Sequence, residues 1–252
     1  MDKTLLIRAC VTGSDALLCL NGMVLCKLIS GQEMRLPVHE FIQSGENRIQ
    51  VILLGSVLND TRSRVCVELQ KDRGADVLVQ PQVLYEFEES LLRGERLEKN
   101  RLIDVCVDLP VSFPKWRYLD VMQASSDGQD LQKIQDFILQ LLRLMQEKKT
   151  TLLLPFFSVR NREIAIAYGL DAQQVHHDFQ QHLRRITAHG IFPDCVWDSQ
   201  SWCLLPVRRA AVYALLNNQH QPLFQLQFDD DGTALQIPMH VGVLGGEVFV
   251  LR

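Results

Sequence analysis

The feature that most constrains this chain is a pair of apolar runs joined by the dipeptide Asn21-Gly22. Residues 16–20 precede the dipeptide and residues 23–29 follow it. Asn-Gly readily takes the positive φ angles of a tight hairpin turn, so the pattern predicts a two-residue β-hairpin. Because both faces of the two expected strands are apolar, we expect the hairpin to lie in the interior of a domain.

The same turn predicts a register for the cysteines of the hairpin. In a regular two-residue hairpin, Cys19 faces Val24 and Leu17 faces Cys26. Cys19 and Cys26 then lie on a diagonal about 7–8 Å apart, which is too far for an unstrained disulfide. The chain has seven cysteines, without a C-x-x-C motif or zinc-finger spacing. We therefore predict reduced, buried thiols, a cytoplasmic location, no metal and no cofactor.

Further strands are expected in the first half of the chain. A turn at residues 44–47 precedes an alternating segment at 48–54, and segments 64–69 and 102–108 have the same β-branched, alternating character. Residues 81–100 fit both a helix and a strand, and the pattern does not decide between them. Short strands separated by turns predict an all-β sandwich, of jelly-roll or immunoglobulin-like type, over residues 1–110.

The second half predicts a different class of fold. Prolines 110 and 114 and a Ser-Ser-Asp-Gly cluster at 125–128 indicate a linker over residues 111–128. Apolar residues then recur at helical spacing, which predicts helices from about 131 to 145, from 150 to 168 with a break or start near Pro155, and from Asp171 to Gly190. Strands are expected at 196–205, 211–216, 223–228, 235–243 and 248–251. Residues 129–252 are therefore predicted to form an α+β domain, with three helices packed on a curved antiparallel sheet.

Each half also resembles a known superfold. The Asn21-Gly22 hairpin, Leu36-Pro-Val38 and the Ser44-Gly-Glu-Asn47 turn before a long strand make residues 3–110 resemble the jelly-roll modules of the galactose-binding-like superfold. The helix order, the segment 222–232 and the closing segment 245–252 are similar to the cone-shaped fold of nuclear transport factor 2 and polyketide-cyclase-like proteins. This second resemblance implies a curved sheet around a pocket. The Asp/His pair that the enzymes of that family use has no match in this sequence.

Histidine and aspartate side chains are the candidate ligand-binding groups. Asp178 and His182 are four residues apart on a predicted helix, a spacing that places them on one face. His240 lies on a predicted strand and would face a pocket in the cone. A polar helix face and a hydrogen-bonded histidine are the structural alternatives.

Four aromatic residues are candidates for an interface. Trp116, Tyr118, Trp197 and Trp202 lie near the linker and near the start of the second set of strands. Exposed together, they would form a binding hot spot, and the alternative is that they pack the two domains together.

Composition excludes several function classes. Twenty-six basic and thirty acidic residues give a net charge of −4, which disfavours nucleic-acid binding. The sequence has no apolar stretch of membrane-spanning length and no common nucleotide, hydrolase or zinc-protease motif. We expect a non-catalytic protein-binding protein of the bacterial cytoplasm, an adaptor or an immunity-type stoichiometric binder. The alternatives are a small-molecule binder or enzyme that uses the second domain, and a carbohydrate-binding module.

Overall fold

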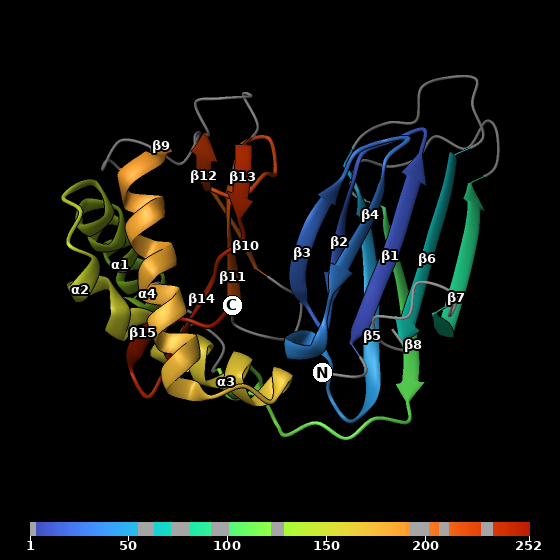
Figure 1. The fold of residues 1–252 in the computed structure, drawn as a ribbon. Coiled ribbons are helices and arrows are strands. Elements are labelled where there is room, and N and C mark those ends of the chain that lie inside the picture. Colours follow the sequence, from blue (N-terminus) through green and yellow to red (C-terminus); the bar gives the residue numbers. More distant parts are fainter. Residues whose placement is uncertain are drawn as a thin grey trace. The chain divides into compact units, whose positions relative to one another are not determined.

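The computed structural model describes residues 4–54, 63–71, 81–91, 101–121, 129–191, 202–206, 212–227 and 234–252. The chain divides into two compact units, Met1–Lys115 and Trp116–Arg252, which are described separately below. Figure 1 shows strands in the first unit and a mixture of helices and strands in the second. None of the helices among these residues has the length and apolar character needed to cross a bilayer.

The described part of the first unit is built from strands in two antiparallel sheets. One sheet has the order β4-β1-β6-β7 and the other has the order β3-β2-β5-β8. The strands are β1 (Leu5–Thr12), β2 (Ala16–Leu20), β3 (Met23–Leu28), β4 (Glu33–Pro37), β5 (Gly45–Leu53), β6 (Ser63–Lys71), β7 (Gln82–Leu91) and β8 (Leu102–Leu109), with a short 3₁₀ turn at His39–Phe41. A sheet-rich first half was predicted, although β1 and β4 were not singled out.

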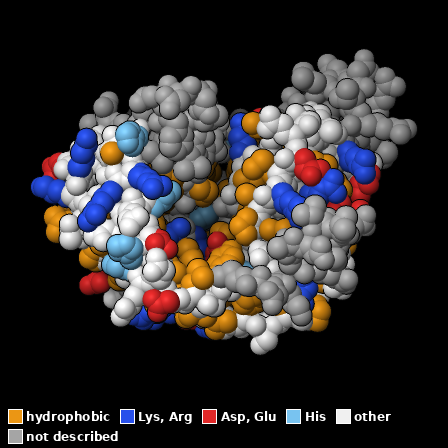
Figure 2. Space-filling view, viewed as in Figure 1, with side chains coloured by type: hydrophobic (Ala, Val, Ile, Leu, Met, Phe, Trp, Pro, Cys, Tyr) orange, Lys and Arg blue, Asp and Glu red, His pale blue; other side chains and the backbone are white. Residues whose placement is uncertain are grey.

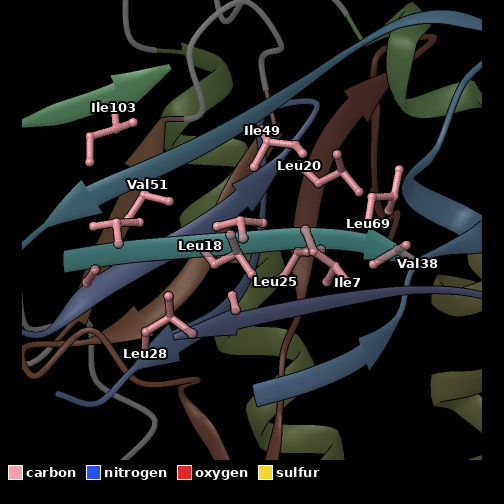
Figure 3. Close-up of a cluster of buried hydrophobic side chains, with 14 of the residues drawn as sticks. Ile7, Leu18, Leu20, Leu25, Leu28, Val38, Ile49, Val51, Leu69 and Ile103 are labelled. Carbon is pink, nitrogen blue, oxygen red and sulfur yellow. The ribbon is translucent and has the colours of Figure 1, made fainter. Parts of the chain in front are cut away.

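Buried residues of both sheets form one hydrophobic cluster. Along β1 the buried positions alternate with partly exposed ones, as they do in a strand with one face toward a core. Figure 3 shows this cluster, to which Ile7 of β1, Leu18 of β2 and Val51 of β5 contribute. Period-two alternation in separate strands thus creates the core of the first unit.

The predicted hairpin is confirmed, and its register differs from the prediction at one end. Asn21 and Gly22 have φ angles of 50° and 82°, and every residue of β2 is buried. Cys19 faces Val24 as expected, but a bulge between Leu18 and Cys19 places Leu18, and not Leu17, opposite Cys26. A bulge sets two residues of one strand against one of the other and so shifts every later pair.

The ambiguous segment at 81–100 contains strand β7, and residues 92–100 lie outside the described part of the chain. β7 pairs with β6 through a ladder that shifts register between Leu69 and Gln70. Tyr85 and Phe87 are partly buried against the core cluster of the first unit. Strand pairing decides the conformation here, because the apolar positions alone fit both periodicities.

The helices of the second unit follow the predicted pattern. They are α1 (Gln129–Gln146), α2 (Thr150–Leu153), α3 (Ser158–Tyr168) and α4 (Ala172–His189), with 3₁₀ turns at Arg117–Asp120 and Leu154–Phe157. The break expected near Pro155 is the 3₁₀ turn between α2 and α3. Gly169 ends α3 with a φ angle of 61°, and Asp171 caps α4 by accepting the N–H of Gln174 at 2.8 Å.

The described strands of the second unit form two antiparallel sheets where one curved sheet was predicted. Their orders are β10-β11-β14-β15 and β13-β12-β9. The strands are β9 (Gly190–Ile191), β10 (Trp202–Pro206), β11 (Val212–Asn217), β12 (Phe224–Gln227), β13 (Ala234–Ile237), β14 (His240–Leu244) and β15 (Glu247–Val250). The single strand predicted at 235–243 is wrong, because the chain breaks at Pro238, which has no N–H to donate to a ladder.

A second hydrophobic cluster joins helices and strands of this unit. It includes Ile138 and Leu142 of α1, Leu183 of α4, and Val241 of β14, all at 0% exposure. The predicted apolar stripe of α1 is buried, except that Leu131 at its start is 37% exposed. The linker predicted at 111–128 is only partly described, and Trp116 and Tyr118 within it are buried.

Candidate functional site

The outer face of the sheet β4-β1-β6-β7 carries an ordered array of charged and thiol side chains. Two rows of side chains cross this sheet. The first row follows the strand order and contains Arg35, Arg8, Glu68 and Glu86. The next row contains Glu33, Cys10, Cys66 and Glu88. We call the set formed by Arg8, Cys10, Glu33, Arg64, Cys66, Glu68, Glu86 and Glu88 the charged face. Figure 2 shows acidic and basic side chains next to one another on the first unit.

Two arginines neutralise most of the carboxylates of the charged face. Arg8 donates to Glu33 at 2.6 Å and to Glu68 at 2.9 Å, and Arg64 donates to Glu88 at 2.5 Å. The hydrogen bond to Glu33 and the charge of Glu68 raise the pKa of the Arg8 guanidinium. Among the described residues Glu86 has no ion-pair partner. A negative charge therefore remains at the β7 side of this face.

Cys10 and Cys66 are neighbouring thiols at the centre of the charged face. They occupy opposite positions of the β1–β6 ladder, and neither forms a disulfide. Burial is the largest cause that raises the pKa of the Cys66 thiol, and contact with Cys10 and the charge of Glu68 add to it. Both thiols are half-buried, so they are open to solvent on one side.

Strand β7 lies at the end of its sheet. Among the described residues it pairs only with β6. Its side chains alternate between partly buried ones (Tyr85 and Phe87) and exposed acidic ones (Glu86 and Glu88). Val83 is 47% exposed. The strand thus presents an edge with Glu86 and Glu88 on one face and with Tyr85 and Phe87 on the other.

The alternation of the ladders, counted from one backbone hydrogen bond of β1, indicates which amides of β7 point away from the sheet. The N–H of Val38, just after β4, donates to the carbonyl of Leu5 at 3.0 Å. The backbone N–H and C=O groups of the odd-numbered residues of β1 therefore point toward β4. In an antiparallel ladder, hydrogen-bonded pairs alternate with pairs that are not hydrogen-bonded. The even-numbered residues of β1 therefore bond to β6, and Cys10 and Cys66 form one of these bonded pairs. The same alternation across β6 makes Val67 and Phe87 the bonded pair. The backbone groups of residues 86 and 88 therefore point outward from β7.

The predicted ligand-binding residues do not share one environment. Asp178 and His182 are on the exposed surface of α4, where Gln174 donates to Asp178 at 2.7 Å. Loss of hydration lowers the pKa of His182, and the charges of Arg160 and Arg185 lower it further. His240 lies in β14 at 1% exposure. Figure 2 shows histidine and basic side chains over α4, in agreement with a polar helix face.

Two of the four predicted interface aromatics are inside the second unit. Trp116 and Tyr118 have exposed fractions of 1% and 0%, and the guanidinium carbon of Arg252 lies 5.6 Å and 4.8 Å from their ring centroids. Trp202 begins β10, and Trp197 lies outside the described residues. An interface role for these aromatic residues stays a prediction.

A buried ion pair was not expected from the sequence. Glu163 of α3 and Arg252 are 4% exposed each, and their side chains lie 2.5 Å apart. The second carboxylate oxygen of Glu163 accepts the backbone N–H of Arg117. Glu163 lies among polar and apolar helix residues at no special spacing, so the sequence carries no signal for this pair.

Sequence reasoning also missed the charged face. The alternation of residues 5–12 and 64–69 places Cys10 and Cys66 on the polar side of their strands, and this signal was present. Their pairing depends on the register between β1 and β6, which the alternation does not contain.

Comparisons of this chain with protein-family models, with curated proteins and with solved structures found no match.

Proposed function

We propose that this chain is a non-catalytic protein-binding protein that takes up an extended, basic segment of its partner along the edge of β7. It would act as an adaptor or an immunity-type stoichiometric binder in the bacterial cytoplasm. In this proposal the first unit is a β-sandwich, whose two sheets share one hydrophobic cluster. The observation that carries the proposal is the outward direction of the backbone groups of residues 86 and 88 on a ten-residue end strand.

Strand addition supplies affinity through the backbone and selectivity through alternate side chains. An unpaired sheet edge is a template for another strand, and proteins commonly protect such edges with charge. On β7 the charge is acidic, with Glu86 and Glu88 on the outer face. An incoming strand with lysine or arginine opposite these positions gains cross-strand attraction.

The same charges disfavour a second copy of this chain as the occupant. Two β7 strands side by side would bring glutamates near one another, and like charges in opposed positions are destabilising. The net charge of −4 adds weak long-range repulsion between copies and weak attraction to a basic partner. A basic extended segment is therefore the occupant that we propose.

The alternative functions draw less support from these residues. The small-molecule or enzyme alternative uses Asp178, His182 and His240, which divide between an exposed helix face and a buried strand. The carbohydrate-binding alternative needs exposed aromatic rings on the first unit. Phe41, Tyr85 and Phe87 are instead packed against its core cluster.

The test compares two proline variants of the full chain. In Glu86→Pro the lost N–H points outward from β7, so the ladder with β6 keeps its bonds. In Arg35→Pro the lost N–H points outward from β4, at the opposite edge of the same sheet. Each tagged protein is used to capture partners from a native lysate of its own source, with quantitative mass spectrometry and a salt series.

We expect one stoichiometric partner that wild type and Arg35→Pro retain and that Glu86→Pro loses. Raising the salt concentration weakens the complex, and hydrogen exchange of the purified complex shows new protection of the amides of residues 86 and 88. Equal capture by both proline variants, absence of any stoichiometric partner, or unchanged exchange in β7 would each overturn the proposal.

A further inference from the structure

We propose that the charged face holds a divalent zinc-type ion, with Cys66, Glu68 and Glu86 as ligands and Cys10 as the fourth. The Sγ atom of Cys66 and one carboxylate oxygen from each glutamate lie within 4.8 Å of one another. Three neighbouring strands, β1, β6 and β7, supply the four side chains. This inference goes beyond the proposed function and does not depend on it.

Glu68 and Glu86 are held close together by the ladder. They occupy a position of the β6–β7 pair that lies between hydrogen-bonded pairs, where the Cα atoms approach to about 4.5 Å and the side chains are nearest. Like charges directly opposite each other are destabilising in a sheet. Arg8 offsets the charge of Glu68, and among the described residues no cation pairs with Glu86. A bound cation between the two carboxylates removes this repulsion.

Cys10 lies outside this group of three ligand atoms and is the ladder partner of Cys66 on β1, so we add it as the neighbouring thiol. The two cysteines form a hydrogen-bonded pair of the ladder, in which Cβ atoms are about 5.5 Å apart. A disulfide needs Cβ atoms about 3.5–4.5 Å apart, so the ladder favours two thiols over a bridge. Two thiols on adjacent strands can both coordinate one ion.

The ligand types select the metal. Thiolate sulfur favours zinc and similar ions, whereas magnesium and calcium prefer sites made of oxygen alone. Two thiolates and two carboxylates match the number and types of ligands that four-coordinate zinc takes. On binding, each cysteine thiol releases its proton to solvent, and the metal takes the place of that proton on sulfur.

Neighbouring side chains hold Glu68 in position for this role. Arg8 donates to Oε1 at 2.9 Å, and the Gln70 amide donates to Oε2 at 2.6 Å. Each carboxylate oxygen has two lone pairs, so both contacts leave a lone pair for a metal. Hydrogen bonds of this kind orient ligands in metal sites. Arg8 and Gln70 are thus positioning residues in the proposed site.

The experiment uses the reduced, metal-free full chain. Zinc is titrated in competition with a chromophoric chelator, and cobalt(II) serves as a spectroscopic probe of thiolate coordination. We expect one zinc per chain and a cobalt complex with a thiolate-to-metal charge-transfer band. Cys66→Ser and Glu86→Gln should each weaken zinc binding at least about tenfold. Glu86→Gln is exposed and keeps its backbone N–H, so it leaves the fold and the strand edge intact.

Three control variants separate this site from other side chains that bind zinc. Glu88→Gln changes the neighbouring glutamate of β7, Cys106→Ser changes an exposed thiol of β8, and His177→Gln changes the histidine-rich face of α4. All three should bind zinc as wild type does. Wild-type affinity in Glu86→Gln and Cys66→Ser, or a cobalt spectrum without the thiolate band, would show adventitious binding and overturn the proposal.

The two proposals are tested by different variants, although Glu86→Pro removes both the outward amide and a proposed zinc ligand. Glu86→Gln tests the metal while the outward amide remains, and Glu86→Pro tests strand addition through the amide that it removes. Repeating the capture experiment with a chelator present shows whether partner binding requires metal. Zinc binding without a partner would support the metal site and reject strand addition. A partner without zinc binding would support strand addition and reject the metal site.

Discussion

Glu163 and Arg252, which are 89 positions apart in the chain, form an ion pair inside the second unit. Arg252 Nη1 lies 2.5 Å from Glu163 Oε2, and the two side chains are 2% and 5% exposed. The guanidinium also lies over the rings of Trp116 and Tyr118. Charges buried this deeply are tolerated when they are paired and hydrogen-bonded, so removal of one partner leaves the other without compensation.

Glu163→Gln should therefore destabilise the protein by about 3–5 kcal/mol, the usual cost of leaving one buried charge unpaired. Urea denaturation followed by circular dichroism measures the change. Glu147→Gln is the control, because its pair with Lys149 is exposed and screened by solvent, so its loss should have little effect on stability. Equal losses of stability in the two variants would show that the buried pair stabilises the protein no more than the exposed pair does.

Asn47 joins two turns of the first unit through its side chain. Its Oδ1 accepts from Asn21 Nδ2 at 2.7 Å and from the Gln43 N–H at 2.9 Å, and its Nδ2 donates to the carbonyls of Gln43 and Gly45. Asn47→Ala should cost about 1–3 kcal/mol, because these polar groups lose partners at a site that is 1% exposed. Chemical denaturation of Asn47→Ala beside Gln43→Ala checks this. A smaller loss for Asn47→Ala than for Gln43→Ala would contradict it.

Asp15 should make the stability of the first unit depend on pH. The backbone N–H of Ser30 donates to Asp15 Oδ1 at 3.0 Å, and Lys27 lies 3.2 Å from Oδ2. The Ser30 contact is the main cause that lowers the pKa of Asp15 below 3.8, and Lys27 lowers it further. Since the folded protein has the lower pKa, the stabilisation is complete above about pH 3.8 and is lost as the pH falls through the folded value.

Asp15→Asn should therefore flatten the acid limb of the stability curve and lower stability at neutral pH by about 1 kcal/mol. Denaturation measured from pH 7 down to pH 3 gives the slope. Asp108→Asn, which changes an exposed carboxylate of β8, is the control. An unchanged slope in Asp15→Asn would show that another carboxylate sets the acid limb.

The two faces of α1 should differ in their sensitivity to truncation. Leu141 is 0% exposed and belongs to the core cluster of the second unit, whereas Leu131 is 37% exposed. Leu141→Ala should cost about 2–5 kcal/mol through lost burial and a cavity, and Leu131→Ala less than about 1 kcal/mol. Thermal and urea unfolding of both variants tests this. Similar losses would mean that the apolar stripe is not the packing face.

Local patterns in the sequence were sufficient for the hairpin at Asn21-Gly22 and for the helices. Positive φ angles at the turn, an aspartate cap at Asp171 and a glycine stop at Gly169 act within a few residues. The energies that fix these features belong to neighbouring residues, so the sequence shows them directly. The apolar stripe of α1 was predictable for the same reason, because its period matches one helix face.

Tertiary structure decided the features that need two distant segments. β7 is a strand because β6 supplies hydrogen bonds to it, although its apolar positions also fit a helix. The pairing of Cys10 with Cys66 and of Glu68 with Glu86 depends on register, and a shift of one strand by one residue would place that strand's side chains on the opposite face from their partners. Register is set by the packing of the whole core, which no local pattern contains. The same holds for Glu163 and Arg252, whose attraction arises only once folding has removed both from water.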